Sequence, residues 1–245
     1  MSLYRTYFMA ALVPLLRTPA YWAPLVIFPS LLFSFFGLTP ARQAPEIANI
    51  LLGSWSAFAV IGIGFFQFGI GIAQARESKW EDYARTLPAG GAPRLVAQLL
   101  CAAVFSAVSL GALWTLALFA TPVSLSVMQF ACLLGVLLAG LIPFVLIGAA
   151  LGYSIPARGA VPIANLLYLP LSYLGGLWLP PQMLPGIVAQ ISPWTPTRQL
   201  GELAWATVQD RPLPADAMTG LALYALAAGL IALVMWRRDE TLKTK

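Results

Sequence analysis

The chain alternates between long apolar runs and short segments that hold all of its charged side chains. Each run has 19 to 27 residues, and no Lys, Arg, Asp or Glu falls inside any of them. A helix rises ~1.5 Å per residue and needs about 20 residues to cross the hydrocarbon core of a membrane. A surface helix of a soluble protein would show one polar face, whereas these runs are apolar all round. The pattern predicts an all-α integral membrane fold, one transmembrane domain over residues 1–245, with six spans at about 20–38, 48–73, 95–120, 127–153, 161–179 and 218–236.

The first sixteen residues predict a further, shorter helix. Leu3, Tyr7, Leu12 and Leu15 fall on one helical face, and the apolar stretch is too short to span. Arg17 follows it directly, without the small-residue pattern of a signal-peptide cleavage site. We therefore expect an N-terminal amphipathic helix that lies on the membrane surface.

Charge placement predicts the orientation of the spans. Only 9% of the residues are charged, against about 25% in soluble proteins. With the N-terminus inside, the cytoplasmic segments hold 11 of the 14 Lys and Arg residues and the outer segments hold 3. Because Lys and Arg accumulate on the cytoplasmic side, both termini are predicted to be cytoplasmic, in a bacterial plasma (inner) membrane. The net charge of +5 reflects this bias, so it predicts no nucleic-acid partner.

The inner loop 74–94 has the composition of a short charged helix followed by a break. Glu77 and Glu81 are four residues apart and share one face, while Trp80 and Tyr83 lie on another. A docking surface for a partner has this pattern. A solvated helix whose aromatic rings rest on lipid headgroups has it too, and the spacing does not separate the two interpretations.

The outer segment 180–217 is too polar and too rich in proline to cross, yet too apolar for a solvated loop. Residues 184–191 and 197–208 read as two short helices, and backbone of this kind must be shielded by protein or face water. Gly175 and Gly176 permit a bend where the fifth span ends. We therefore predict outer re-entrant helices before the last span, with 184–191 dipping into the outer leaflet.

The chain lacks the residues of most catalytic sites. It has no histidine, which excludes Ser-His and Cys-His catalysis and any His-ligated metal or haem. It has no GxxxxGK[ST] loop for binding ATP. We expect a non-catalytic membrane subunit without a cofactor.

The spans carry a few polar or small positions that indicate packing or passage. Ion-coupled transporters usually keep a charged residue at membrane depth, and these spans have none. Gly148 and Gly152 form a GxxxG pair, which marks close contact with another helix. Four amide side chains either bond between helices or, for Gln67 and Asn165 in particular, line a substrate path: Gln67, Gln98, Gln129 and Asn165.

Two motifs, placed relative to the spans, give a resemblance that covers nearly the whole chain. After the second span comes Arg76-Glu77, then Glu81, then Leu87-Pro88. Before the last span comes Gly175-Gly176-Leu177-Trp178-Leu179-Pro180, continuing to Pro185 and Pro193. With the N-terminal helix and six spans, the chain resembles the permease subunits of type-2 ATP-binding-cassette exporters.

The resemblance implies a function and partners. It implies that a separate ATPase subunit docks on a coupling loop containing Arg76, Glu77, Trp80 and Glu81. It implies an outer gate whose hinge holds Gly175, Gly176, Pro180 and Pro185. Because six spans are half of what such exporters use, a second copy or a sister permease would complete the substrate path in the lipid membrane as a dimer. A non-transporting scaffold or assembly protein is the alternative, followed by a secondary transporter.

Overall fold

The computed structural model describes residues 3–77 and 91–243, and these residues form helices with no strand among them. The α-helices are α1 (Leu3–Leu16), α2 (Pro19–Leu32), α3 (Leu38–Ala41), α4 (Pro45–Ile63), α5 (Gly71–Arg76), α7 (Gly91–Ala120), α8 (Val127–Ser154), α9 (Ala157–Leu174), α10 (Gly186–Ile191), α11 (Pro196–Val208) and α12 (Ala215–Lys243). The π-helical segments are η1 (Phe33–Gly37), between α2 and α3, and η2 (Gly64–Ile70), between α4 and α5. Two 3-10 turns flank α10, η3 (Pro181–Met183) and η4 (Ser192–Trp194). The all-α prediction is confirmed.

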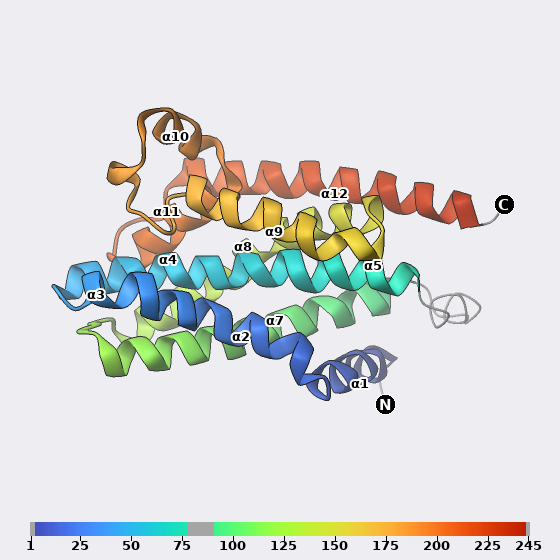
Figure 1. The fold of residues 1–245 in the computed structure, drawn as a ribbon, viewed down its shortest axis with the longest axis horizontal. Helices are drawn as coiled ribbons and strands as arrows, with labels where there is room; N and C mark the ends of the chain where they lie inside the picture. Colours follow the sequence, from blue (N-terminus) through green and yellow to red (C-terminus); the bar gives the residue numbers. More distant parts are fainter. Residues whose placement is uncertain (1–2, 78–90, 244–245) are drawn as a thin grey trace.

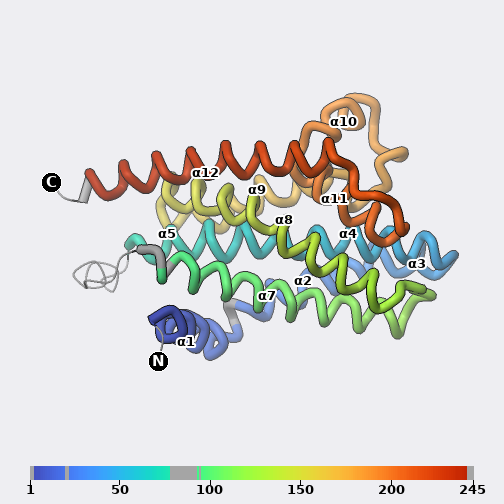
Figure 2. Tube along the Cα trace, turned by 180° about the vertical axis from the view of Figure 1, so that it is seen from behind, coloured from blue at the N-terminus to red at the C-terminus, as the bar shows by residue number. Residues whose placement is uncertain are grey.

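The long helices lie side by side around the continuous helix α4–η2–α5 (Figure 1). In the most apolar stretch of that helix 89% of the residues are buried, against 17–39% in the corresponding stretches of the other four described helices that are apolar enough to span. Both chain ends, α1 and the end of α5 lie at one end of the bundle, which we call the termini end (Figures 1 and 2). At the opposite end, the far end, lie α3, α10 and α11.

Five of the six predicted spans are helices long and apolar enough to cross a membrane. In the described part of the chain these are Trp22–Ala41, Pro45–Arg76, Leu95–Ala120, Val127–Ser154 and Ala215–Thr241. The predicted span at 161–179 corresponds to α9, which has 18 residues and ends at Leu174. At ~1.5 Å per residue α9 is about 27 Å long, close to the ~30 Å of a hydrocarbon core. The helix begins earlier than predicted and ends where the glycine pair turns the chain.

The predicted N-terminal helix is present as α1 and packs against the side of the bundle. None of the residues of α1 is buried, but Leu12 and Leu15 pack against the core. α1 lies beside α7 at the termini end (Figure 2).

Glycines bring η2 and α8 into backbone contact. A Cβ on Gly152 would lie 2.6 Å from the carbonyl oxygen of Gly69, and one on Gly148 would overlap that of Gly64. No side chain fits there, so only glycine allows this approach. The GxxxG pair of the fourth span therefore packs on the second span.

Aromatic rings fill the core between the central helix and α9. Phe58 and Tyr168 stack with ring centroids 4.6 Å apart, and the Tyr168 hydroxyl donates to the Phe58 carbonyl at 2.9 Å. Trp55 and Trp178 extend this cluster towards the far end. The outward faces are apolar as well; on α12 they include Leu223, Leu226 and Leu230, each more than 60% exposed. Such a surface suits a bilayer rather than water.

Candidate functional site

At the termini end, Arg76 ties the last turn of the second span to two other helices. Its Nε donates to Asp239 Oδ1 of α12 at 2.9 Å, and Nη2 donates to the same oxygen. Its Nη1 donates to the carbonyl of Gly152 in α8 at 2.9 Å. The Asp239 side chain is only 4% exposed, so this ion pair is largely withdrawn from water. Arg76 thus joins the end of α5 to α8 and α12.

Glu77 makes a corresponding contact with α9. Its Oε1 accepts a hydrogen bond from the backbone N–H of Ala157, the first residue of α9, at 2.8 Å. The residue before it, Pro156, has no side-chain acceptor for the helix N–H groups. A helix N-terminus has unpaired N–H groups and a partial positive charge, so a carboxylate from another segment stabilises it.

These contacts locate half of the predicted coupling residues. Arg76 and Glu77 lie at the base of the inner loop and connect it to three helices. Trp80 and Glu81 fall within 78–90, outside the described residues. The acidic partner Asp239 was missed by the sequence analysis, because nothing in the basic C-terminal segment distinguishes it from a solvated charge.

At the far end, α9 stops in a hydrogen-bonded glycine turn. The N–H of Gly176 donates to the Tyr173 carbonyl at 3.0 Å, and the N–H of Leu177 donates to the Ser172 carbonyl at 3.2 Å. The φ angle of Gly176 is 74°. This is the Schellman arrangement, which satisfies the last carbonyls of a helix and favours glycine at the left-handed position.

Position 175 needs glycine because a neighbouring side chain leaves no room for a Cβ, not because of its own backbone angles. A Cβ at Gly175 would lie 2.5 Å from Thr197 Oγ1 at the start of α11. Thr197 Oγ1 in turn donates to the Leu171 carbonyl of α9 at 2.6 Å. The ends of α9 and α11 are therefore in direct contact. The two predicted hinge prolines follow, with Pro180 just before η3 and Pro185 just before α10.

The outer segment contains two short helices, and the one that enters the bundle is α11. α11 packs against α4, α8 and α12, and the indole N–H of Trp205 donates to Ser54 Oγ at 2.8 Å. α10 has no buried residue and projects from the side of the far end (Figure 1). That 184–191 dips into the outer leaflet stays a prediction, whereas the helix packed among the other helices covers Pro196–Val208.

The two candidate path residues lie in different places. Gln67, in η2, is 8% exposed and borders a pocket between α1, η2–α5 and α7. Asn165, in α9, is half-buried and its side-chain amide donates to the Val161 carbonyl of its own helix at 3.1 Å. Asn165 does not line that pocket, so the structure does not bring the two together.

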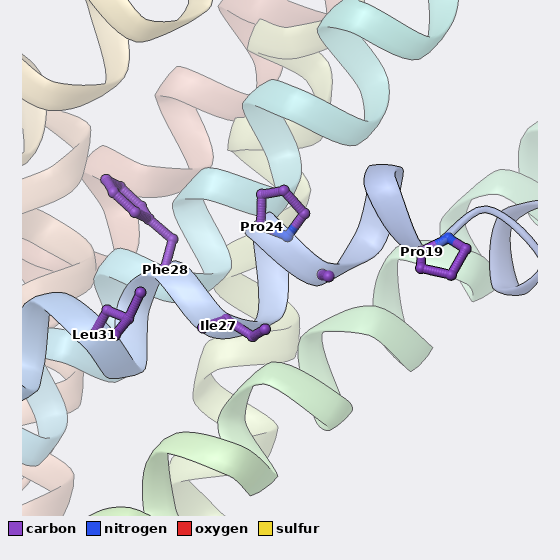
Figure 3. A pocket seen from close by; sticks show the side chains of 6 residues that line it. Pro19, Pro24, Ile27, Phe28 and Leu31 are labelled. Atoms are coloured by element: carbon purple, nitrogen blue, oxygen red, sulfur yellow. The ribbon is translucent and has the colours of Figure 1, made fainter.

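A second hollow lies on the outer face of α2. It has a volume of about 550 Å³ and runs along one side of the helix from Pro19 past Pro24 to Leu31 (Figure 3). Its described lining is wholly apolar, so it offers no group for orienting a polar ligand.

The comparisons with known proteins fit this architecture. Residues 3–202 match the ABC-2 type transporter family. The chain belongs to the ABC-2 type transporter family. It is also similar to the Bacillus subtilis (strain 168) protein named "Putative transport permease YvfS", with 28% identity over 170 residues, or 69% of each chain. The resemblance seen in the sequence is therefore confirmed, and the site residues of this ABC-2 family member can be considered in terms of transport.

Proposed function

We propose that this ABC-2 family chain is the transmembrane subunit of an ATP-driven exporter. In this proposal a separate ATP-binding-cassette ATPase docks on the 74–94 loop at the cytoplasmic face, and both termini lie on that side. A second copy or a sister permease completes the path. The ABC-2 match and the 11-to-3 division of basic residues support the proposal.

The observation that carries the coupling proposal is the position of α9. One end of this helix is held by Glu77, at the base of the inner loop. Its other end is the Gly175–Gly176 turn, in contact with α11. A movement of the loop would therefore reach the far end through a single helix about 27 Å long.

We assign different tasks to the four coupling residues. Arg76 and Glu77 hold α8, α9 and α12, so they transmit movement to the bundle. Trp80 and Glu81 then contact the ATPase, since an aromatic side chain is a common anchor of an interface. Closure of the ATPase dimer would pull on this loop. The glycine turn would absorb the change in backbone angles as α11 moves.

The docking step is tested with Trp80→Ala combined with Glu81→Lys in the full chain. We expect normal membrane insertion, loss of the co-purifying ATPase and loss of export. The two substitutions are combined because one exposed charge alone contributes only ~0.2–1 kcal/mol. The matched control is Glu46→Lys combined with Trp194→Ala, at the far end, which should retain the ATPase.

Two results would contradict the proposal. Export at the wild-type level in the Trp80/Glu81 variant would remove the docking role. A wild-type chain that is purified from its native membrane without any ATP-binding-cassette subunit or ATP hydrolysis would favour the scaffold alternative.

A further inference from the structure

A pocket of about 450 Å³ lies within one protomer, between α1, the η2–α5 segment and α7. Most of its wall is apolar, including Leu15, Phe68 and Cys101. Four of its lining side chains can form hydrogen bonds: Thr18, Gln67, Gln74 and Gln98. Pockets of a few hundred Å³ with an apolar wall and a few polar groups are typical of small-ligand sites.

Gln67 places a carboxamide at the wall of this pocket. It is 8% exposed, and its Oε1 has no hydrogen-bond partner among the residues that the structure describes. Gln98 borders the same space from α7. The pocket is therefore suited to a group that forms hydrogen bonds with carboxamides.

The described part of the lining matches a neutral headgroup. No charged side chain is part of the lining in the described ranges, so a buried phosphate or ammonium group would remain uncompensated. A carboxamide presents a donor and an acceptor, and a hydroxyl group matches both. Thr18 Oγ1 donates to the Pro14 carbonyl at 2.9 Å, which leaves its lone pairs to accept from a ligand.

We propose that this pocket binds a membrane amphiphile with an uncharged, hydroxyl-bearing headgroup, of the diacylglycerol class. The headgroup hydroxyl bonds to Gln67 and Gln98, and the apolar wall takes the first part of the acyl chains. Access is from the membrane surface beside α1, which packs on the bundle without any buried residue. The site is formed by a single chain, so the inference does not depend on ATP-driven export.

Gly71 provides a way to fill the pocket without disturbing the backbone. It lines the pocket, and a Cβ built on it meets nothing within 4 Å. Its φ is −59°, which any residue adopts. Gly71→Leu should therefore occupy the pocket, and helix propensity favours the change. Gly135→Leu is the matched control, because Gly135 in α8 is exposed, also has nothing within 4 Å and does not line the pocket.

The test uses the full chain in phosphatidylcholine nanodiscs with a photoactivatable diacylglycerol, and the cross-linked peptides are mapped by mass spectrometry. We expect cross-links on α1, η2–α5 and α7. Gly71→Leu should lower them at least tenfold and Gln67→Leu by roughly threefold to tenfold, the effect of one lost hydrogen bond, whereas Gly135→Leu should match the wild type.

Competition separates the headgroup from the acyl chains. Unlabelled diacylglycerol should displace the probe, and phosphatidate with the same chains should not. Equal displacement by both lipids would overturn the neutral-headgroup assignment. Wild-type labelling in both Gly71→Leu and Gln67→Leu, or wild-type cross-links confined to the outward face of α12, would overturn the site itself.

Discussion

The contact between Arg76 and Asp239 offers a quantitative test of how the inner loop is joined to the bundle. The perturbation is Asp239→Asn, which removes the negative charge while keeping the size and one acceptor of the side chain. Asp239 is 4% exposed and Arg76 is 23% exposed. The variant would leave a largely buried guanidinium without this charged partner.

The expected magnitude follows from two opposing effects. Two unit charges ~4 Å apart attract by about 4 kcal/mol at an effective dielectric constant of ~20. Removing both charges from water offsets much of that attraction. Arg76 also keeps its hydrogen bond to the Gly152 carbonyl. We therefore expect Asp239→Asn to lower the free energy of unfolding by about 1–3 kcal/mol, or roughly 2–4 °C in Tm for each kcal/mol in a chain of this size.

The assay is thermal unfolding of the detergent-solubilised chain for Arg76→Gln, Asp239→Asn and the double variant. A double-mutant cycle isolates the interaction between the two side chains, and we expect a coupling energy of about 1–2 kcal/mol. Glu202→Gln is the control, since the Glu202 side chain is 35% exposed against 4% for Asp239, and an i,i+4 helix pair such as its pair with Arg198 contributes ~0.3–0.5 kcal/mol. A coupling energy near zero, or equal Tm losses in Asp239→Asn and Glu202→Gln, would refute the reasoning.

Two other predictions concern the far end and the orientation. Gly175→Val should lower both Tm and export, because the valine side chain would overlap Thr197. The expected loss of unfolding free energy is about 1–3 kcal/mol. Gly186→Val is the control, because nothing lies within 4 Å of a Cβ built there. Wild-type stability with reduced export would instead favour a hinge that acts only in motion. In a background without native cysteines, impermeant maleimide should label Gln43→Cys but not Ser2→Cys in intact cells, because the basic residues gather on the side of the termini. Labelling of Ser2→Cys from outside would invert the orientation.

The sequence by itself was enough for the membrane architecture. Apolar runs long enough to cross hydrocarbon predict helices, because an unpaired backbone polar group is too unfavourable there. The glycine pair at 175–176 and the absence of charge in the spans could also be recognised from the sequence, because both are local properties. The end of α9 at Leu174, five residues before the predicted end, shows the limit of this approach. Apolarity continues past the turn, so the apolar pattern alone placed the end of the helix too late, although the glycine pair marked the bend.

Which segments meet was decided by the tertiary structure. The pair Gly148 and Gly152 predicted close packing, but its partner in η2 follows from how α8 crosses the central helix. Asp239 is 163 residues from Arg76 in sequence, and no local pattern relates them. The same holds for Gln67, whose amide could have formed an interhelical hydrogen bond by its sequence alone but lies at a pocket bordered by α1. Local sequence fixes helices because their hydrogen bonds are local, whereas contacts between helices depend on shape complementarity over surfaces that only the folded chain brings together.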